Sequence, residues 1–350
     1  RSKVRSRIVA DQLVKLIKEA DHVVIMGHRM SDLDAIGSAE GVLRICKICD
    51  VPAVIAVRRD ATLAGSLINA LIAAGQEDDF IDPKGALPII SQRTLCIVVD
   101  TYQLGLVESR EILEKCGKVA VIDHHRKGVG FIEKADLVCH EPYASSASEL
   151  VTEFLQYVGD RDDKPNRIEA EGLLSGIMLD TRDFTLHTGV RTFEAAAALR
   201  RYGAETEHVR QLFDVSMVEY TTKATLVSEA QMYRGCAITV SGEVAPEARV
   251  AIAQAANDLL TIQNVEASFV AVQVGGGVNI SARSLGAVNV QVIMESLGGG
   301  GHQTMAAAQL KHITPEAVRS RIQTAIDQYR EAQKKSGLES ESEQKKKDKQ

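Results

Sequence analysis

The chain has 350 residues, of which 45% are hydrophobic, and it contains no tryptophan. This length exceeds that of a typical single domain, so we expect two hydrophobic cores. Its 47 acidic residues outnumber its 41 lysines and arginines, which gives a formal net charge of −6. Proteins that bind long nucleic acids normally carry a basic surface, so this charge argues against broad nucleic-acid binding.

The sequence has no signal peptide and no apolar run close to the length of a membrane helix, so we expect this segment to be soluble and cytoplasmic. Its six cysteines are scattered, which predicts reduced thiols. Cys46 and Cys49 end an apolar helical pattern, where one buried and one surface thiol are expected rather than a redox motif. Because the first residue is arginine, we expect the chain to be part of a longer protein.

Apolar strands alternate with helical patterns in the first part of the chain. The strands are expected near residues 23–26, 53–57, 95–99 and 119–122, and the helices near residues 9–20, 35–49 and 106–116. This alternation predicts an α/β fold of right-handed βαβ units, with a parallel sheet covered by helices on both faces.

Acidic and histidine residues follow three of the expected strands. They are His28, Asp32 and Asp34 after the first strand, Asp100 after the third, and Asp123, His124 and His125 after the fourth. Ligands of an open parallel sheet bind outside the carboxyl ends of its strands, so these side chains should converge. A single strand that ends in aspartate more often supplies a helix cap or a structural ion pair, but three such strands together indicate a metal site.

Carboxylates and imidazoles suit a divalent ion such as Mn²⁺, and the absence of cysteine from the motifs argues against a thiolate zinc site. Asp180 ends the apolar segment 173–179 and could enter the same crevice from a helix terminus. The candidate ligands are too many for one ion and predict a hydrolytic centre with two Mn²⁺ ions, or alternatively Mg²⁺ or Co²⁺. These ligands are His28, Asp32, Asp34, Asp100, His124 and Asp180.

The pattern becomes helical from about residue 145 to residue 200. Ser146 and Glu149 have the spacing of a capping box, which predicts a helix start. Farther along, a strand over 278–283 alternates apolar and polar residues and places Asn279, Ser281 and Arg283 on one face. An arginine beside hydroxyl groups can bind phosphate through two hydrogen bonds.

These motifs resemble the four motifs of the DHH phosphoesterase superfamily: His28-x-x-x-Asp32-x-Asp34, Asp100-Thr101, Asp123-His124-His125, and Asp180 within residues 176–181. Gly298 to Gly301, followed by His302, resembles the glycine-rich motif of the companion DHHA1 domain. Residues 281–284 and 289–295 most resemble the membrane-anchored cyclic-di-AMP phosphodiesterases, in which this module follows a sensory domain and a degenerate GGDEF domain. The resemblance covers about residues 1–330.

The resemblance implies a parallel-sheet DHH domain over 1–203, a helical connector over 204–224 and a smaller α/β DHHA1 domain over 225–332, with the active site in the cleft between the domains. Residues 333–350 are polar and charged and are expected to form a disordered tail. A glycine run alone is more often a loop or a helix C-cap. In the context of the DHH motifs, we expect the second domain to bind substrate through Ser281, Arg283, Gly299, Gly300, Gly301 and His302.

The function implied is Mn²⁺-dependent hydrolysis of cyclic-di-AMP to 5′-pApA by water activated between two metals, in second-messenger signalling. Asp100 would bridge the ions, with His28 and Asp32 on one ion and Asp34, His124 and Asp180 on the other. His125 is expected to contact phosphate or to donate a proton, and Asp123 to orient an imidazole or a loop amide. Arg126 and Lys127 are equally consistent with a phosphate contact and a solvated pair. Tyr102 departs from the histidine or asparagine common in relatives.

The main alternative is a nanoRNase or adenosine-bisphosphate phosphatase, which uses the same centre on short linear substrates. A RecJ-type exonuclease is disfavoured by the acidic charge, and a catalytically dead sensor by the presence of every ligand. Inorganic pyrophosphatases share the DHH motifs but lack the glycine-rich histidine motif. As partners we expect a cyclic or short dinucleotide, no long nucleic acid, a second copy in a homodimer, and a membrane tether through a preceding region.

Overall fold

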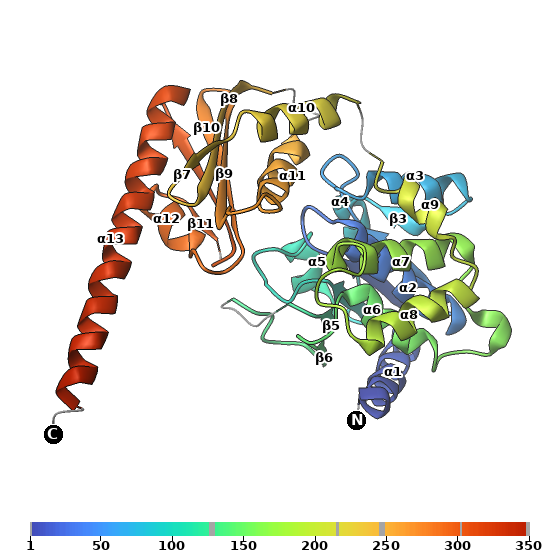
Figure 1. Cartoon of the computed structure of the whole chain (residues 1–350). Coiled ribbons are helices and arrows are strands. Elements are labelled where there is room, and N and C mark those ends of the chain that lie inside the picture. The colour runs from blue at the N-terminus through green and yellow to red at the C-terminus, as the bar shows by residue number, and fades with distance from the viewer. Residues whose placement is uncertain (1, 126–129, 215–216, 245–248, 302, 348–350) are drawn as a thin grey trace. The chain divides into compact units, whose positions relative to one another are not determined.

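The computed structural model describes residues 2–125, 130–214, 217–244, 249–301 and 303–347. The chain forms two compact units, unit 1 over Arg1–Asp214 and unit 2 over Val215–Gln350 (Figure 1). The expected connector over 204–224 is divided between them. Helix α9 (Thr206–Gln211) belongs to unit 1 and helix α10 (Met217–Ser228) to unit 2, because each buries an apolar side chain in the core of its own unit.

Unit 1 is built on a sheet of six parallel strands in the order β3-β2-β1-β4-β5-β6. These strands are β1 (His22–Met26), β2 (Ala53–Ala56), β3 (Phe80–Ile81), β4 (Thr94–Val99), β5 (Lys118–Asp123) and β6 (Leu137–His140). The strand order reverses at β1 and β4, which lie side by side although β2 and β3 separate them in sequence. This confirms the parallel α/β fold.

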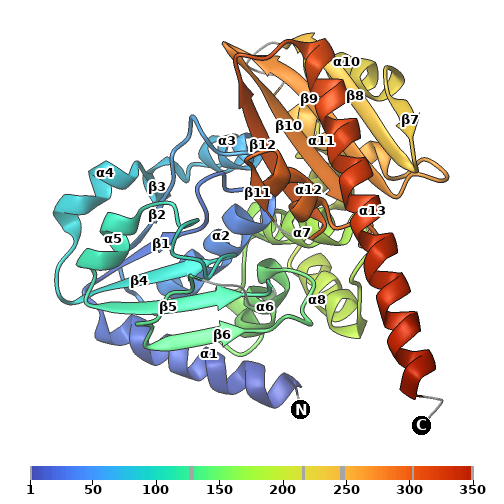
Figure 2. The same cartoon turned by 90° about the vertical axis from the view of Figure 1, so that its left-hand side faces the viewer.

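Helices cover both faces of this sheet, as Figure 2 shows. One face carries α1 (Ser2–Glu19), α2 (Leu33–Ile48), α3 (Gly65–Ala73), α6 (Ala147–Leu155), α7 (Arg167–Thr181) and α8 (Val190–Arg201). The other face carries α4 (Pro83–Ala86) and α5 (Arg110–Lys115). Three short 3₁₀ turns complete the unit: η1 (Glu77–Asp79), η2 (Leu87–Ile89) and η3 (Arg161–Asp163).

Strand β4 shows why the sheet forms. All its residues are buried, with Ile97 and Val99 in the core under α2 and with Cys96 and Val98 in the core under α5. Apolar side chains on both faces are typical of a parallel strand that is covered twice. After Thr94 at its start, the strand carries no charged or hydroxyl side chain until its carboxyl end.

Helix α6 begins as predicted, with Ser146 as its N-cap, and the Ser146 hydroxyl accepts a hydrogen bond from the Glu149 amide at 3.0 Å. The second half of the expected capping box is different. The Glu149 carboxylate accepts hydrogen bonds from the amide and the hydroxyl of Ser145 instead of the Ser146 amide. The contacts of Ser146 and Glu149 together fix the first turn of the helix.

Unit 2 contains a mixed sheet of six strands in the order β11-β12-β10-β9-β8-β7. The strands are β7 (Gln231–Tyr233), β8 (Cys236–Glu243), β9 (Ala267–Val274), β10 (Gly277–Ser284), β11 (Gly300–Gly301) and β12 (Met305–Lys311). Helices α12 (Val290–Ser296) and α13 (Pro315–Lys347) pack on one face, and α10 and α11 (Arg249–Leu259) pack on the other.

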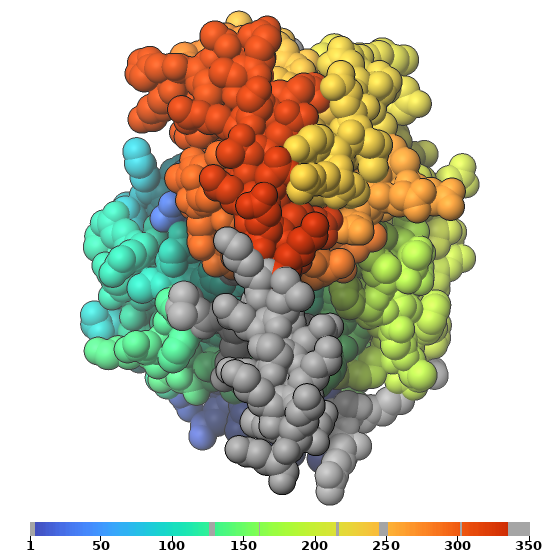
Figure 3. All heavy atoms as spheres, turned by 60° about the vertical axis from the view of Figure 1, so that its left-hand side comes forward, coloured from blue at the N-terminus to red at the C-terminus, as the bar shows by residue number. Residues whose placement is uncertain are grey.

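Helix α13 continues to Lys347 through the segment that composition predicts to be a disordered tail. Its first half is anchored by buried Val318 and Ile322. On the surface of unit 2 the side chains of α13 (red) lie beside those of an earlier part of the chain (yellow) (Figure 3). The Tyr233 hydroxyl of β7 donates to Asp327 of α13. The tail is rich in lysine, glutamate and glutamine and contains no proline, so an anchored helix can extend through it.

All six cysteines are free thiols, with Cys46 buried and Cys49 partly buried at the end of α2, as expected. Within the described residues, no helix is both long enough and apolar enough to span a bilayer.

A buried carboxyl group in α2 makes the stability of unit 1 depend on pH. Burial, together with the neighbouring Glu169 and Asp79, raises the pKa of Glu40 from 4.5 to about 8. Between pH 4.5 and about pH 8, the folded state therefore holds a proton on Glu40 that the unfolded state has released. The free energy of unfolding consequently falls as the pH rises through this range.

We predict that Glu40→Gln, which is neutral at every pH, stabilises the protein relative to wild type increasingly between pH 5 and pH 9. The gain should be on the order of a few kcal/mol. Thermal unfolding of both proteins across this range measures it. A difference that does not change with pH would show that Glu40 titrates normally.

Candidate metal centre

The candidate ligands meet at the carboxyl ends of β1, β4 and β5, where the strand order reverses. Ligands bind at such switch points in open α/β sheets. Three groups of side chains have ligand atoms within 4.8 Å of one another: His28, Asp32 and Asp100; Asp34, Asp100, His124 and Asp180; and Asp100, Asp123, His124 and His125. The structure thus brings all six predicted ligands together, and Asp100 belongs to every group.

The first group lies between β1 and the start of α2. His28 Nε2 lies 3.4 Å from Asp100 Oδ2 and 3.8 Å from Asp32 Oδ1. Asp32 also caps α2, because its Oδ1 accepts hydrogen bonds from the amides of Asp34 and Ala35. The helix start therefore fixes the direction in which this carboxylate points.

The second group is gathered around His124. Its Nε2 atom lies 3.0 Å from Asp180 Oδ2, 3.4 Å from Asp100 Oδ1 and 3.8 Å from Asp34 Oδ2. Asp34 is completely buried, and the amides of Ala147 and Ser148 donate to its two oxygens at 2.7 and 2.8 Å. The N-terminus of α6 therefore holds a ligand candidate that belongs to α2.

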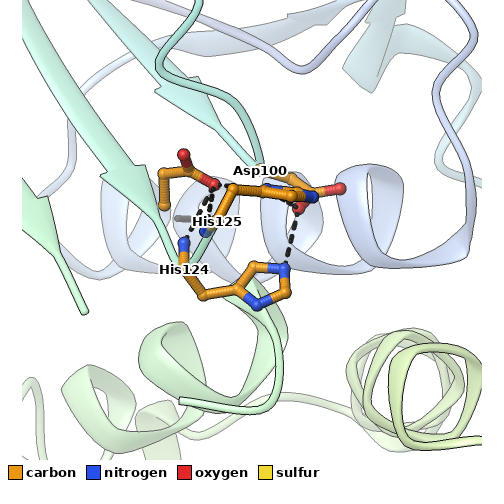
Figure 4. A group of neighbouring side chains, drawn as sticks. Asp100, His124 and His125 are labelled. Atoms are coloured by element: carbon orange, nitrogen blue, oxygen red, sulfur yellow. Dashed lines mark hydrogen bonds and ion pairs between the residues drawn. The ribbon is translucent and has the colours of Figure 1, made fainter. Parts of the chain in front are cut away.

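Asp100 lies between the two groups. Its φ of 58° is in the left-handed region, which few residues other than glycine adopt, and it occurs directly after β4. Figure 4 shows the Asp100 carboxylate and the His124 ring facing each other. In the described part of the chain, Asp100 Oδ1 and His124 Nε2 are buried and make no hydrogen bond. Their close contacts are ion pairs with each other and with Asp180, and buried polar atoms without hydrogen bonds are expected at a site built for a cation.

Carboxyl groups and imidazoles lie close together in the centre, and this proximity and their burial shift their pKa values. Burial disfavours the charged imidazoles, but Asp100 and its neighbours outweigh burial and raise the pKa of His28 to about 10 and that of His124 to about 12. Burial raises the pKa of Asp180 to about 6 and that of Asp34 well above its usual value. Two imidazoles thus balance a cluster of carboxylates, and a divalent cation can take over that role.

Asp123 organises the loop after β5. It is fully buried, and its Oδ1 accepts hydrogen bonds from the amides of His124 and His125 and from His125 Nδ1 at 2.8 Å. The His125 side chain is 54% exposed, and its Nδ1 lies 3.7 Å from Asp100. His125 is therefore the solvent-facing histidine of the pair, and Asp123 orients it.

The sequence did not identify His140, and it did not show that Tyr102 packs against it. His140, at the end of β6, donates from Nε2 to the backbone oxygen of His125. The ring of Tyr102 packs edge-on against His140, with ring centroids 5.5 Å apart. Tyr102 thus contacts the histidine loop indirectly, through His140. Arg126 and Lys127 lie outside the described residues.

In unit 2, β10 alternates as predicted and leaves Asn279, Ser281 and Arg283 partly exposed on one face. Arg283 Nη1 donates to the Ser281 hydroxyl at 3.2 Å. The glycine run lies on the far side of β12 from β10. A Cβ on Gly299 would lie 2.1 Å from the Ala307 oxygen, whereas a Cβ on Gly300 would meet nothing within 4 Å.

The last two residues of this motif are Gly301 and His302. A Cβ on Gly301 would lie 2.5 Å from Ala306 Cα, so Gly299 and Gly301 permit strand pairing while Gly300 faces open space. His302 lies outside the described residues.

These glycines give a matched pair of variants. We predict that Gly299→Ala destabilises unit 2 by about 1–3 kcal/mol through the backbone clash. Gly300→Ala should leave thermal stability unchanged and weaken dinucleotide binding, because its methyl group occupies the open face. Unchanged binding by Gly300→Ala, measured by calorimetry, would reduce the glycine run to a structural role.

A second pair tests the sharing of Asp100. Asp100→Asn should weaken Mn²⁺ binding at both groups and lower any hydrolytic rate by several orders of magnitude. Asp32→Asn should weaken only the His28 group, because asparagine preserves the N-cap of α2. Isothermal titration with Mn²⁺ and metal analysis compare the variants. Full metal content in Asp100→Asn would argue against a bridging carboxylate.

Comparison with known proteins identifies the two units. Residues 22–177 match the DHH family, N-terminal domain, and residues 244–333 match the DHHA1 domain. The chain is 45% identical to "Cyclic-di-AMP phosphodiesterase GdpP" of Geobacillus thermodenitrificans, over 95% of this chain and 51% of that protein. It is 41% identical to "Cyclic-di-AMP phosphodiesterase PdeA" of Listeria monocytogenes, over 94% of this chain and 51% of that protein. The chain thus spans about half the length of these relatives.

A solved structure supports the fold. An exopolyphosphatase-related protein from Bacteroides fragilis superposes with a TM-score of 0.78 at 21% identity, and the match covers 93% of this chain and 98% of that one. The two family matches fall in the same order as the two units of the structure. The residues of the DHH motifs lie together at the strand ends of the first unit. The chain therefore belongs to the DHH family and carries its N-terminal domain followed by a DHHA1 domain.

Proposed function

We propose that the chain is a metal-dependent phosphodiesterase that opens cyclic-di-AMP to the linear dinucleotide 5′-pApA. The observation that carries this proposal is the pair of ligand groups that share Asp100. The substrate is suggested by the names of relatives that are 41% and 45% identical. Since the chain spans about half of those proteins, the proposal concerns the hydrolytic step alone.

The residues present fit two divalent ions. His28 and Asp32 would hold one ion, Asp34, His124 and Asp180 the other, and Asp100 would contact both. Mixed carboxylate and imidazole ligands without thiolate favour Mn²⁺, with Mg²⁺ and Co²⁺ as alternatives. Bound ions of this kind lower the pKa of water and neutralise charge on a phosphoryl group.

His125 is the side chain that we propose to act on the leaving oxygen. Burial lowers the pKa of its imidazole, but Asp123 and Asp100 together raise it above the usual value, which favours the protonated form of the ring. It is also partly exposed, so a substrate can reach it. A protonated imidazole in this place can donate to the departing 3′ oxygen or contact the phosphate.

For unit 2 we propose a role in substrate binding. Ser281 and Arg283 share a face of β10, and their hydroxyl and guanidinium groups can bind a phosphate away from the attacked phosphorus. The glycine run would admit the ligand close to its backbone at Gly300. Binding energy from such remote contacts can be used to orient the reacting group. The interdomain cleft, the homodimer, and a cytoplasmic module tethered to a membrane remain predictions.

The direct test is chromatography of products after incubation with Mn²⁺ and one of four substrates: cyclic-di-AMP, cyclic-di-GMP, pApA and adenosine 3′,5′-bisphosphate. We expect fastest turnover of cyclic-di-AMP, with 5′-pApA as the product, and no turnover by Asp100→Asn. Faster turnover of pApA or the bisphosphate would favour the nanoRNase alternative. Binding of cyclic-di-AMP without turnover of any substrate would indicate a sensor.

His125→Ala should retain wild-type metal content while the turnover number falls by roughly 10²–10⁴. The physical reason is that Asp123 and its amide contacts, which order the loop, remain after the imidazole is removed. Metal analysis and steady-state kinetics on the same preparation separate the two effects. Loss of one ion in this variant would mean that His125 is a ligand.

A further inference from the structure

Helices α2 and α7, which pack against each other, each contain two glycines four residues apart. Gly37 and Gly41 lie in α2, and Gly172 and Gly176 lie in α7. A Cβ on Gly37 would lie 2.3 Å from the Gly172 oxygen, so the two backbones are nearly in contact. None of the four glycines has a positive φ. Since glycine weakens a helix interior, close approach is the physical reason for its presence.

Gly176 differs from the other three in what surrounds it. A Cβ at this position would lie 2.3 Å from the Ser148 hydroxyl oxygen, 2.6 Å from Asp34 Oδ1 and 2.8 Å from Asp34 Cα. Asp34 and Ser148 are both fully buried. Gly176 therefore borders a carboxylate of the candidate metal centre, whereas a Cβ on Gly172 would meet the end of the flexible Leu67 side chain at 3.2 Å.

The Asp34 carboxylate is held beside position 176 by two hydrogen bonds. Its Oδ1, the atom that faces Gly176, accepts from the Ser148 amide at 2.8 Å, and its Oδ2 accepts from the Ala147 amide at 2.7 Å. Both amides belong to the first turn of α6, which the Ser146 hydroxyl caps. The carboxylate is thus held between this helix terminus and the surface of α7.

The same helix crossing sets the distance between two ligand candidates. Asp180 lies four residues after Gly176, which places both on the same side of α7. Asp180 and Asp34 approach His124 Nε2 to 3.0 and 3.8 Å from different helices. Any change in the separation of α2 and α7 therefore changes how these two carboxylates face one ion.

We propose that Gly176 is a positioning residue for the metal group of Asp34, His124 and Asp180. The space left by its missing side chain is bordered by the Ser148 hydroxyl and the Asp34 carboxylate, and a methyl group there displaces Asp34 from its place beside Asp180 and His124. This inference rests on the proposed metal centre. It predicts that the group of His28 and Asp32 is left unchanged.

The test compares Gly176→Ala with the matched control Gly172→Ala, which adds the same methyl group one turn earlier on the same helix. Isothermal titration of the full chain with Mn²⁺ gives the number and affinity of bound ions. Gly172→Ala should bind as wild type does. Gly176→Ala should lose roughly 10- to 100-fold in affinity at one of two sites, which is typical when the support of a metal ligand is removed.

Three results overturn the proposal: wild-type affinity in Gly176→Ala, equal weakening at both sites, or equal weakening in the Gly172→Ala control. The first leaves the proposed function intact, since wild type still binds metal. Failure of wild-type protein to bind Mn²⁺ would instead reject the metal centre itself and this inference with it.

A stability measurement covers the case in which Gly176→Ala fails to fold. Thermal unfolding in the presence of a chelator compares the effect of Gly176→Ala in the wild-type and the Asp34→Ala backgrounds. A clash with Asp34 predicts a smaller loss of melting temperature, or recovery of folding, when that carboxylate is absent. The contacts with Ser148 Oγ and Asp34 Cα are present in both backgrounds, so equal losses would show that the Asp34 carboxylate is not the group displaced.

Discussion

A single buried carboxylate, Asp100, is the group on which the rest of the site depends. It faces His28 on one side and His124 on the other, each at 3.4 Å. An unpaired charge in such a place is expensive, so the imidazoles, or cations in their place, must be present. The fold supplies them because β1, β4 and β5 are adjacent parallel strands whose carboxyl ends meet at one edge. The left-handed turn at Asp100 ends the buried strand at this point.

The remaining ligands come from helices, whose positions are set by backbone contacts. The first amides of α6 hold Asp34, and the glycine faces of α2 and α7 let Asp34 and Asp180 approach the same imidazole. Such contacts leave little freedom, because protein interiors are densely packed and a single methyl group cannot be absorbed without a shift. The geometry of the centre is therefore fixed by the same interactions that stabilise unit 1.

The sequence predicts well which residues lie at the strand ends, but it predicts poorly the contacts that hold these residues in place. Asp100 and His124 could be identified because buried parallel strands expose polar residues only at their ends. The roles of His140 and of the α6 amides could not, because these contacts join distant segments; Asp34 and Ser148 are 114 residues apart. The polar tail over 333–350 is a different case, and its disorder stays a prediction. Composition records low hydrophobicity, but an anchored helix such as α13 can extend through a polar segment.

Two cations that share Asp100 would explain why the ligand groups meet at this residue. Anomalous diffraction at the manganese edge, from a crystal of the chain soaked in Mn²⁺, can locate these cations. We expect two anomalous peaks, one beside His28 and Asp32 and one beside Asp34, His124 and Asp180, with an oxygen of Asp100 coordinated to each. A single peak, or two peaks of which either lies outside coordinating distance of Asp100, would contradict the claim.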